Sequence, residues 1–171
     1  MQYEQDKHID TLYDTYVDDI FRFLYNRLGS RERAIDLTQD VFVKMWQTYL
    51  SKGVALEYPK ALLFRIARNM LINSYERDKK HESLEDLSEE GFDVPDSTQD
   101  AAAQARAAEL RRMLARLPEQ DAEIITLRHL EGFSVQELAV LYDVSENVLS
   151  VRLHRALAKL EAAYKPPTAH D

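Results

Sequence analysis

The chain has 171 residues, of which 45% are hydrophobic and 30% are charged, and its formal net charge at pH 7 is −8. The absence of cysteine excludes disulfides, thiolate metal sites and cysteine nucleophiles. No apolar run approaches the roughly 18 residues of a membrane-spanning helix, and the opening residues MQYEQDKHID lack the apolar core of a signal peptide. We therefore expect a soluble, cytoplasmic protein.

The negative charge is concentrated in one short segment. Residues 83–104 contain seven acidic and no basic residues, whereas residues 1–82 carry no net charge. The segment also contains a glycine, a proline and few large apolar side chains. We expect a flexible acidic linker here, between a first domain at residues 1–82 and a second domain at residues 105–164, with a tail at residues 165–171.

Three helices are predicted in the first domain. The first covers residues 8–28 and ends at Gly29. The second follows Ser30, a favourable N-cap residue, and extends through RERAIDLTQDVFVKMWQTYL. The third begins at Pro59, because proline is favoured in the first turn of a helix, and continues to Lys80.

The second predicted helix has two distinct faces. Helical spacing places one stripe in the core, namely Ala34, Leu37, Val41, Met45 and Tyr49. The other face carries Asp36, Gln39, Asp40, Val43 and Gln47, with Trp46 at its edge. Acidic residues beside Val43 and Trp46 indicate a surface that docks on another protein. The solvated face of an ordinary helix fits the same pattern equally well.

The third predicted helix carries a polar face opposite its apolar stripe. This face combines cations with amides, namely Arg65, Arg68, Asn69, Glu76 and Lys79, with Asn73 and Lys80 at its edge. The aromatic residues Tyr58, Phe64 and Tyr75 are close in sequence. Such a combination suits a single nucleic-acid strand, whose bases stack on rings and whose phosphates meet cations. An ordinary amphipathic helix with a basic end is an equal competitor.

The second domain ends in a predicted helix-turn-helix. A helix over DAAAQARAAELRRMLARL and another over EQDAEIITLRHLE precede it. Ser134 and Glu137 have the spacing of a capping box, and Ser145 is placed to cap the last helix. The turn between the last two helices, around YDVS, is short, and its Asp143 tolerates left-handed backbone angles.

The last predicted helix separates an apolar stripe from a polar face. The stripe consists of Leu149, Leu153, Ala156, Leu157, Leu160 and Tyr164. The opposite face presents Asn147, Val151, His154 and Arg155, flanked by Ser150, Arg152 and Lys159. Because asparagine and arginine form paired hydrogen bonds with base edges, this helix suits the major groove of DNA. An amphipathic core helix with solvated basic residues is the alternative, which the caps and the short turn disfavour.

No catalytic chemistry is indicated by the sequence. The five histidines include no pair four residues apart, and there is no glycine-rich phosphate loop. We therefore expect an all-α protein of two small helical domains that is not an enzyme and has no catalytic residue, metal site or cofactor.

Three stretches, in this order, resemble the extracytoplasmic-function (group 4) sigma factors of the bacterial sigma-70 family: AIDLTQDVFVKMW, YPKALLFRIARNMLINSYERDKK and the region from Leu114 to Leu160. The resemblance implies an RNA polymerase sigma factor that directs promoter recognition, promoter melting and transcription initiation for a stress or environmental response. Its implied partners are promoter DNA, an anti-sigma factor and the polymerase core, through the β′ clamp helices and the β flap. We expect the free chain to be monomeric and not inserted in a membrane.

The resemblance also assigns roles to three sets of residues. The set implied for polymerase binding is Asp36, Gln39, Asp40, Phe42, Val43 and Trp46. The set implied for the −10 element is Arg65, Arg68, Asn69, Asn73, Arg77, Lys79 and Lys80. The set implied for the −35 element is Ser145, Glu146, Asn147, Val148, Ser150, Val151, Arg152, His154 and Arg155. In this family the linker threads into the RNA-exit path of the polymerase, where seven acidic residues would suit a basic channel.

The chain departs from the family pattern at several positions. Asn73 stands where aspartate is frequent, Leu62 stands where tryptophan is frequent, and Ser150 stands where a lysine or arginine is frequent. The base sequence of the −35 element therefore cannot be transferred from the family to this chain.

Two other functions fit the residues alone. A helix-turn-helix regulator would bind duplex DNA unaided and use the first domain as a sensor or dimerisation unit. A helical adaptor would bind only protein, and changes at four positions would then have no effect, namely Arg65, Asn69, Arg152 and Arg155.

Overall fold

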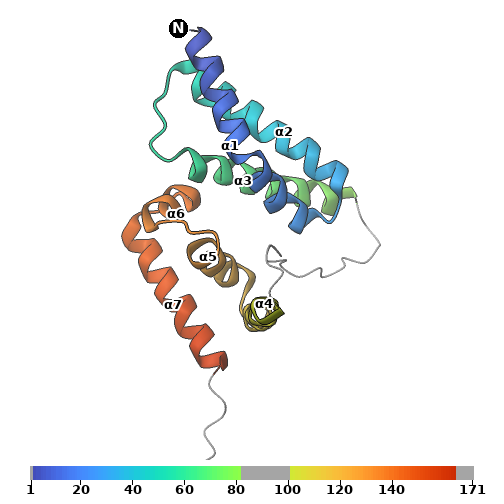
Figure 1. Ribbon diagram of the computed structural model, residues 1–171, viewed down its shortest axis with the longest axis vertical. Coiled ribbons are helices and arrows are strands. Elements are labelled where there is room, and N and C mark those ends of the chain that lie inside the picture. The colour runs from blue at the N-terminus through green and yellow to red at the C-terminus, as the bar shows by residue number, and fades with distance from the viewer. Residues whose placement is uncertain (1, 82–100, 165–171) are drawn as a thin grey trace, which may run out of the picture. The chain divides into compact units, whose positions relative to one another are not determined.

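The computed structural model describes residues 2–81 and 101–164, so the predicted tail and nearly all of the predicted acidic linker lie outside it (Figure 1). The described chain is helical and divides into two compact units. The N-terminal unit contains α1 (Gln2–Leu28), α2 (Arg31–Thr48), the short 3-10 helix η1 (Leu50–Lys52) and α3 (Pro59–His81). The C-terminal unit contains α4 (Ala101–Leu114), α5 (Glu119–His129), most of α6 (Val135–Tyr142) and α7 (Glu146–Tyr164). The predicted all-α fold of two helical units is confirmed.

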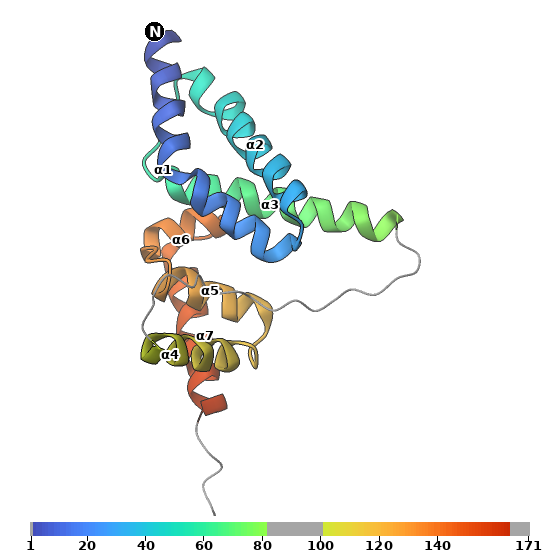
Figure 2. The same cartoon turned by 45° about the vertical axis from the view of Figure 1, so that its right-hand side comes forward.

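The three long helices of the N-terminal unit enclose one apolar core. α1 and α2 lie side by side, and both pack against α3 (Figures 1 and 2). Phe23 of α1 meets Phe64 of α3 edge to face, with ring centroids 5.1 Å apart. The other side chains that are almost completely buried here are Ile20, Leu24, Ala34, Val41, Met45, Leu63 and Ala67. Burial of these apolar side chains is the main force that holds the three helices together.

The junctions of this unit follow the predicted capping residues in most places. Gly29 has a φ of 63°, a left-handed angle that glycine adopts without strain, and it ends α1. The hydroxyl of Ser30 accepts a hydrogen bond from the backbone N–H of Arg33 and caps α2. α2 ends at Thr48, two residues earlier than predicted, because the chain tightens into η1 and turns at Gly53 with a φ of 69°.

The C-terminal unit is built around α5 and α7, which pack against each other, with α4 against α7 (Figure 1). Leu127 of α5, Phe133, Leu138 of α6 and Leu149 of α7 are almost completely buried. α4 begins at Ala101, one residue after the predicted start of this helix, and ends at Leu114, three residues before its predicted end. The last four residues that the charge pattern had assigned to the linker, AAAQ, are therefore helical, as expected of strong helix formers.

None of the helices in the described part of the chain is long and apolar enough to cross a lipid bilayer.

Candidate nucleic-acid and protein interfaces

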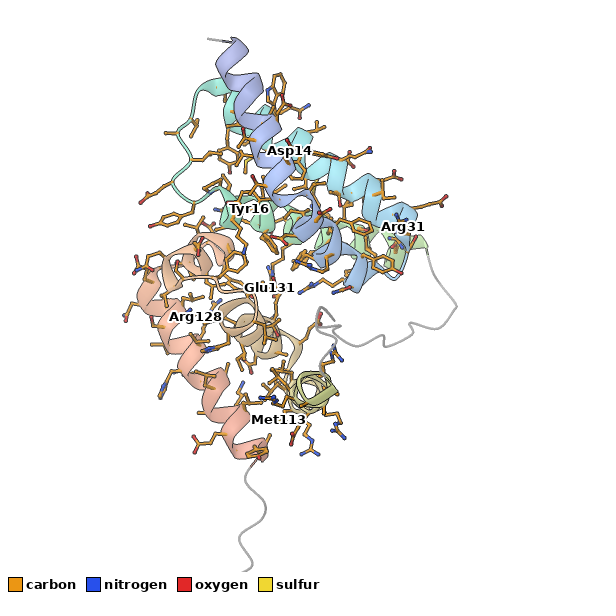
Figure 3. The ribbon with its side chains drawn as sticks, viewed as in Figure 1. Asp14, Tyr16, Arg31, Met113, Arg128 and Glu131 are labelled. Carbon is orange, nitrogen blue, oxygen red and sulfur yellow. The ribbon has the colours of Figure 1, made fainter. Side chains whose placement is uncertain are left out.

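The start of α6 is fixed by a complete capping box. The backbone N–H of Glu137 donates to the hydroxyl of Ser134 at 3.1 Å, and the backbone N–H of Ser134 donates to the carboxylate of Glu137 at 2.8 Å. Arg128 of α5, labelled in Figure 3, donates to the carbonyl of Phe133 at 3.1 Å. The predicted capping box is confirmed, and α6 is held on α5 in a fixed direction.

The turn between α6 and α7 has the short form that a helix-turn-helix requires. It occupies the three residues from Asp143 to Ser145, and the backbone N–H of Val144 donates to the carbonyl of Ala139. Asp143 has a φ of 55°, so the left-handed angle predicted at this position is present. The hydroxyl of Ser145 accepts a hydrogen bond from the backbone N–H of Val148 at 3.3 Å, as predicted for the cap of the last helix.

α7 exposes every residue that the sequence assigned to DNA reading. Leu149 and Ala156 are fully buried and fix the rotation of α7 about its own axis. Between and beside them, the side chains that stand free of the core are Ser145, Glu146, Asn147, Val148, Ser150, Val151, Arg152, His154 and Arg155. This surface, called the α7 face below, combines two cations with amide and hydroxyl groups and two exposed valines. It offers hydrogen-bond donors, acceptors and apolar contacts to base edges.

Three residues of α7 differ from their predicted surroundings, two of them in the apolar stripe and one beside the polar face. Leu157 is exposed because it lies at the edge of the apolar arc, and Tyr164 is 62% exposed at the last turn of the helix. Both predictions of burial were wrong. Lys159, expected to flank the DNA-reading surface, instead forms an ion pair of 2.5 Å with Asp121 at the start of α5. Lys159 therefore ties α7 to α5.

α2 exposes a mixed acidic and apolar surface. Asp36, Gln39, Asp40 and Trp46 are exposed as predicted, and Val43 is 51% exposed. Ile35 is also exposed, at helical spacing from Gln39 and Val43, which the sequence reasoning missed although the spacing could have revealed it. The docking face is defined here as Ile35, Asp36, Gln39, Asp40, Val43 and Trp46. Three exposed large apolar side chains thus share one face of α2 with two carboxylates, a composition that suits contact with another protein.

Phe42 does not belong to this surface. It is 4% exposed, and its ring meets the ring of Tyr13 edge to face, with centroids 4.9 Å apart. Its placement in the polymerase-binding set was wrong in this respect, because at 100° per residue Phe42 turns toward α1 while Val43 turns toward solvent. Phe42 supports the docking face from beneath through the packing of α2 on α1.

The predicted DNA-binding residues of α3 lie in two environments, one exposed and one half-buried. Asn69, Asn73 and Arg77 are exposed, whereas Arg65 and Arg68 are half-buried and take part in other interactions. Arg77 curls back along its own helix, where its Nε donates to the carbonyl of Asn73 at 3.4 Å. The side chains of Lys79 and Lys80 lie outside the described part.

Two of the three aromatic side chains near this polar surface serve the fold. Phe64 is buried against Phe23, so it is not available for stacking on a base. Tyr75 is exposed, but its hydroxyl donates to the carbonyl of Arg27 at the end of α1. Tyr58 is half-buried. A stacked aromatic pair that the sequence reasoning missed lies on α1, where the half-buried ring of Phe21 and the exposed ring of Tyr25 have centroids 5.7 Å apart, and the guanidinium of Arg31 approaches the Phe21 ring.

Comparison with known families matches almost all of the described chain. Residues 12–81 match the family model "Sigma-70 region 2", and residues 107–160 match the family model "Sigma-70, region 4". The first match covers α2 and α3 with most of α1, and the second covers the helix-turn-helix.

Two curated proteins of Bacillus subtilis are similar over most of their length. The RNA polymerase sigma factor YlaC is 30% identical over 158 residues, which cover 90% of each chain. The ECF RNA polymerase sigma factor SigM is 29% identical over 161 residues, which cover 91% of this chain and 94% of SigM.

Two solved structures share the fold. The sigma factor RpoE of Bartonella quintana, in complex with the anti-sigma factor NepR, superimposes with a TM-score of 0.60 over 94% of this chain and 99% of that chain, at 19% identity. CnrH, in complex with the cytosolic domain of CnrY, superimposes with a TM-score of 0.55 over 92% of this chain and 87% of that chain, at 23% identity.

Proposed function

Because this chain belongs to the extracytoplasmic-function group of the sigma-70 family and is an RNA polymerase sigma factor for transcription initiation, we propose that its two helical units divide the recognition of a promoter between them. The C-terminal unit reads the −35 element as duplex DNA. The N-terminal unit binds the polymerase core and holds the opened −10 element. The polymerase core supplies the chemistry of RNA synthesis, and the chain itself has no catalytic role.

The α7 face contacts the −35 element and reads its base sequence. The observation that carries this assignment is that all nine predicted residues are exposed, on a helix whose start is fixed by the cap at Ser145. Arg152 and Arg155 provide guanidinium groups for phosphates or guanine, and Asn147 provides an amide that pairs with adenine. Val148 and Val151 offer methyl groups to thymine. The N-terminal residues of a recognition helix are those that meet base edges, which fits Asn147, Val148 and Val151 in the first two turns of α7.

Holding of the opened −10 element falls to α3. Asn69, Asn73 and Arg77 are exposed along this helix and offer amide and cationic groups to an unpaired strand. Arg65 and Arg68, half-buried beside them, support the same surface through positive charge rather than as free side chains. Such a surface suits a strand whose bases are already separated, because amides reach the hydrogen-bonding edges that pairing would occupy.

Binding of the polymerase core falls to the docking face of α2. Val43, Trp46 and Ile35 provide apolar contact, and Asp36 and Asp40 provide charge that selects a basic partner surface. The partner on the polymerase is the pair of β′ clamp helices, and the C-terminal unit meets the β flap. The site of action is the cytoplasm, because that is where a bacterial polymerase transcribes DNA.

An anti-sigma factor is the proposed regulator of this chain. Two proteins of the same fold, the RpoE of Bartonella quintana and CnrH, have been solved with the anti-sigma factor NepR and with CnrY. By analogy, the regulator would cover the docking face or the DNA-reading surfaces and release the chain in response to stress or an environmental change. The free chain would then act as a monomer.

Transcription in vitro tests the proposal. Sigma-free bacterial core polymerase is incubated with a library of genomic fragments, with and without the protein, and the start sites are mapped. We expect discrete start sites that need the protein, preceded by two shared sequence blocks at the −10 and −35 positions. If an active cognate core gives the same start sites with and without the protein, while the protein alone shifts duplex DNA, the chain acts instead as a stand-alone regulator.

A further inference from the structure

The C-terminal half of α3 is not fixed by burial in the core. Leu71 is buried, but each described side chain that follows it, from Ile72 to Asp78, is exposed or half-buried. This half extends beyond the ends of α1 and α2 that meet at the Gly29–Ser30 turn (Figure 2). It nevertheless carries Asn73 and Arg77, two of the three exposed residues proposed to hold the −10 strand. Some other interaction must fix the direction of this part of the helix.

Polar contacts from the turn between α1 and α2 provide that interaction. Arg33, in the first turn of α2, donates to the hydroxyl of Ser74 at 2.9 Å and also to the carboxylate of Asp78. Tyr75 adds a hydrogen bond to the carbonyl of Arg27. All three of these α3 residues lie beyond Leu71, so the contacts bind the part of α3 that the core leaves unsupported.

The anchored residues and the DNA-facing residues alternate along the same two turns. Ser74 follows Asn73 directly, and Asp78 follows Arg77 directly, so each pair is separated by about 100° around the helix. Fixing one face of the helix therefore fixes the direction in which the other face presents its amide and its guanidinium. A rotation or tilt of α3 that broke the contacts of Arg33 would move Asn73 and Arg77 by the same angle.

We propose that Arg33 is a positioning residue for strand separation, which orients the C-terminal half of α3 toward the −10 non-template strand without touching the DNA. This proposal rests on the proposed role of α3. Both contacts come from one guanidinium nitrogen of Arg33, Nη2, whose two N–H groups have fixed directions in the guanidinium plane, whereas the ammonium of lysine rotates freely and holds neither direction. The proposed function of the ion pair is thus to fix the direction of α3.

The exposure of the pair makes this proposal testable in a folded protein. The side chains of Arg33 and Asp78 are 47% and 43% exposed, and exposed ion pairs contribute little to global stability. Loss of the pair should therefore leave the cooperative unfolding of the N-terminal unit almost unchanged. The effect should appear in the step that needs a correctly directed helix, which is the capture of the unpaired strand.

The experiment compares Arg33→Ala and Arg33→Lys with the charge-exchanged pair Arg33→Asp/Asp78→Arg. The matched control is Arg22→Ala, which removes another exposed arginine of the same unit from an ion pair with Asp19 inside α1. Each holoenzyme is mixed with a promoter found in the transcription screen that carries 2-aminopurine in the −10 non-template strand, and the fluorescence rise on strand separation is followed. Core affinity and the thermal unfolding midpoint are measured in parallel.

We expect Arg33→Ala to slow strand separation by about threefold to tenfold, with core affinity and unfolding midpoint close to those of Arg22→Ala. Arg33→Lys should fall between Arg33→Ala and the unchanged protein, and the charge-exchanged pair should recover part of the loss. Strand separation by Arg33→Ala at the rate of Arg22→Ala would overturn the proposal. So would a loss of core affinity and of cooperative unfolding in proportion to the loss of strand separation, because Arg33 would then only stabilise the fold.

Two further variants separate this proposal from the function it rests on. If Asn73→Ala and Arg77→Ala impair strand separation and Arg33→Ala does not, the role of α3 stands and the role of Arg33 falls. If Asn73→Ala and Arg77→Ala leave strand separation unchanged, the roles proposed for α3 and for Arg33 are both wrong, since there would be no strand contact for Arg33 to direct.

Discussion

Arg155 lies exposed on the α7 face, one turn beyond Val151 and Arg152. At this position a guanidinium reaches either a guanine edge or a phosphate, and the two contacts have different signatures. Removal of a base contact weakens binding only to DNA that carries the recognised base. Removal of a phosphate contact weakens binding to DNA of every sequence. Affinities for promoter DNA and for unrelated DNA therefore show whether a side chain of α7 contacts a base or a phosphate.

Replacement of Arg155 by alanine should weaken promoter binding by the holoenzyme about tenfold or more, the usual cost of a lost contact to a base edge. Binding is measured at a fixed salt concentration, because DNA affinity depends steeply on salt. Arg112→Ala serves as the matched control, since Arg112 is an exposed arginine of α4 in the same unit. Equal affinities of Arg155→Ala and Arg112→Ala for the promoter would remove Arg155 from the −35 contact.

Val43 should contribute most to polymerase binding by the docking face, because it is the most exposed of the apolar side chains of α2. Val43→Glu should lower the affinity for the polymerase core at least about tenfold, since a charge would replace an apolar contact at the centre of the interface. Lys44→Glu changes an exposed neighbour that points about 100° away and should have a much smaller effect. Core affinity measured by competition with a second sigma factor decides between these outcomes, and a similar loss in both variants would contradict the assignment.

At the scale of the elements, the helix-turn-helix was predictable because its signals are local. The capping box at Ser134 and Glu137 and the cap at Ser145 depend on residues three apart, and the structure contains all of these hydrogen bonds. The left-handed angle of Asp143 follows from a short turn without glycine. Local backbone chemistry was sufficient for the caps and the turn, but it did not predict the exposure of Leu157 and Tyr164.

The N-terminal unit was less predictable, because its surfaces depend on how the helices pack. Helical spacing identified Asp36, Gln39 and Val43 as exposed, but it did not distinguish Phe42, which the contact with Tyr13 buries. The hydrogen bonds from Arg33 to Ser74 and Asp78 join residues more than forty positions apart in the sequence, so no local sequence pattern predicts them. The roles of all these residues in binding stay predictions.

Asp143 allows the turn itself to be tested. Asp143→Val should destabilise the C-terminal unit by about 1–2 kcal/mol, because a β-branched side chain is strained at a positive φ. Asp143→Asn removes the same charge but tolerates the left-handed angle, so it isolates the effect of the backbone. Thermal or denaturant unfolding measures both variants. If valine and asparagine were equally stable, the strain at this turn would be negligible.

At the scale of the whole molecule, a net charge of −8 is compatible with the two proposed DNA-reading surfaces because the charge is unevenly distributed. Seven acidic residues lie in residues 83–104, most of which are outside the described part, and the α7 face is locally cationic. DNA affinity depends on the phosphates neutralised at the contact rather than on the total charge. The free chain should therefore bind promoter duplexes weakly, and association with the core should supply most of the non-specific attraction.

The acidic segment should contribute to core binding if it enters a basic channel of the polymerase. Neutral replacement of its seven acidic residues should weaken core affinity, and more so at low salt, where charge interactions are least screened. Neutral replacement of Asp10, Asp14 and Asp18, exposed acidic residues of α1, controls for the loss of negative charge outside the linker, compared per charge removed. Core affinity that stays unchanged when the linker is neutralised would exclude this role.

Site-specific photo-crosslinking tests the division of promoter recognition between the two units most directly. A photoreactive benzoylphenylalanine is introduced at Val151 of α7 in one variant and at Asn73 of α3 in another, and each is assembled on a promoter found in the transcription screen. We predict that the Val151 variant crosslinks to duplex DNA at the −35 position. We predict that the Asn73 variant crosslinks to the −10 non-template strand, and only when the polymerase core is present. Crosslinking of both positions to the same duplex segment in the absence of the core would contradict the account.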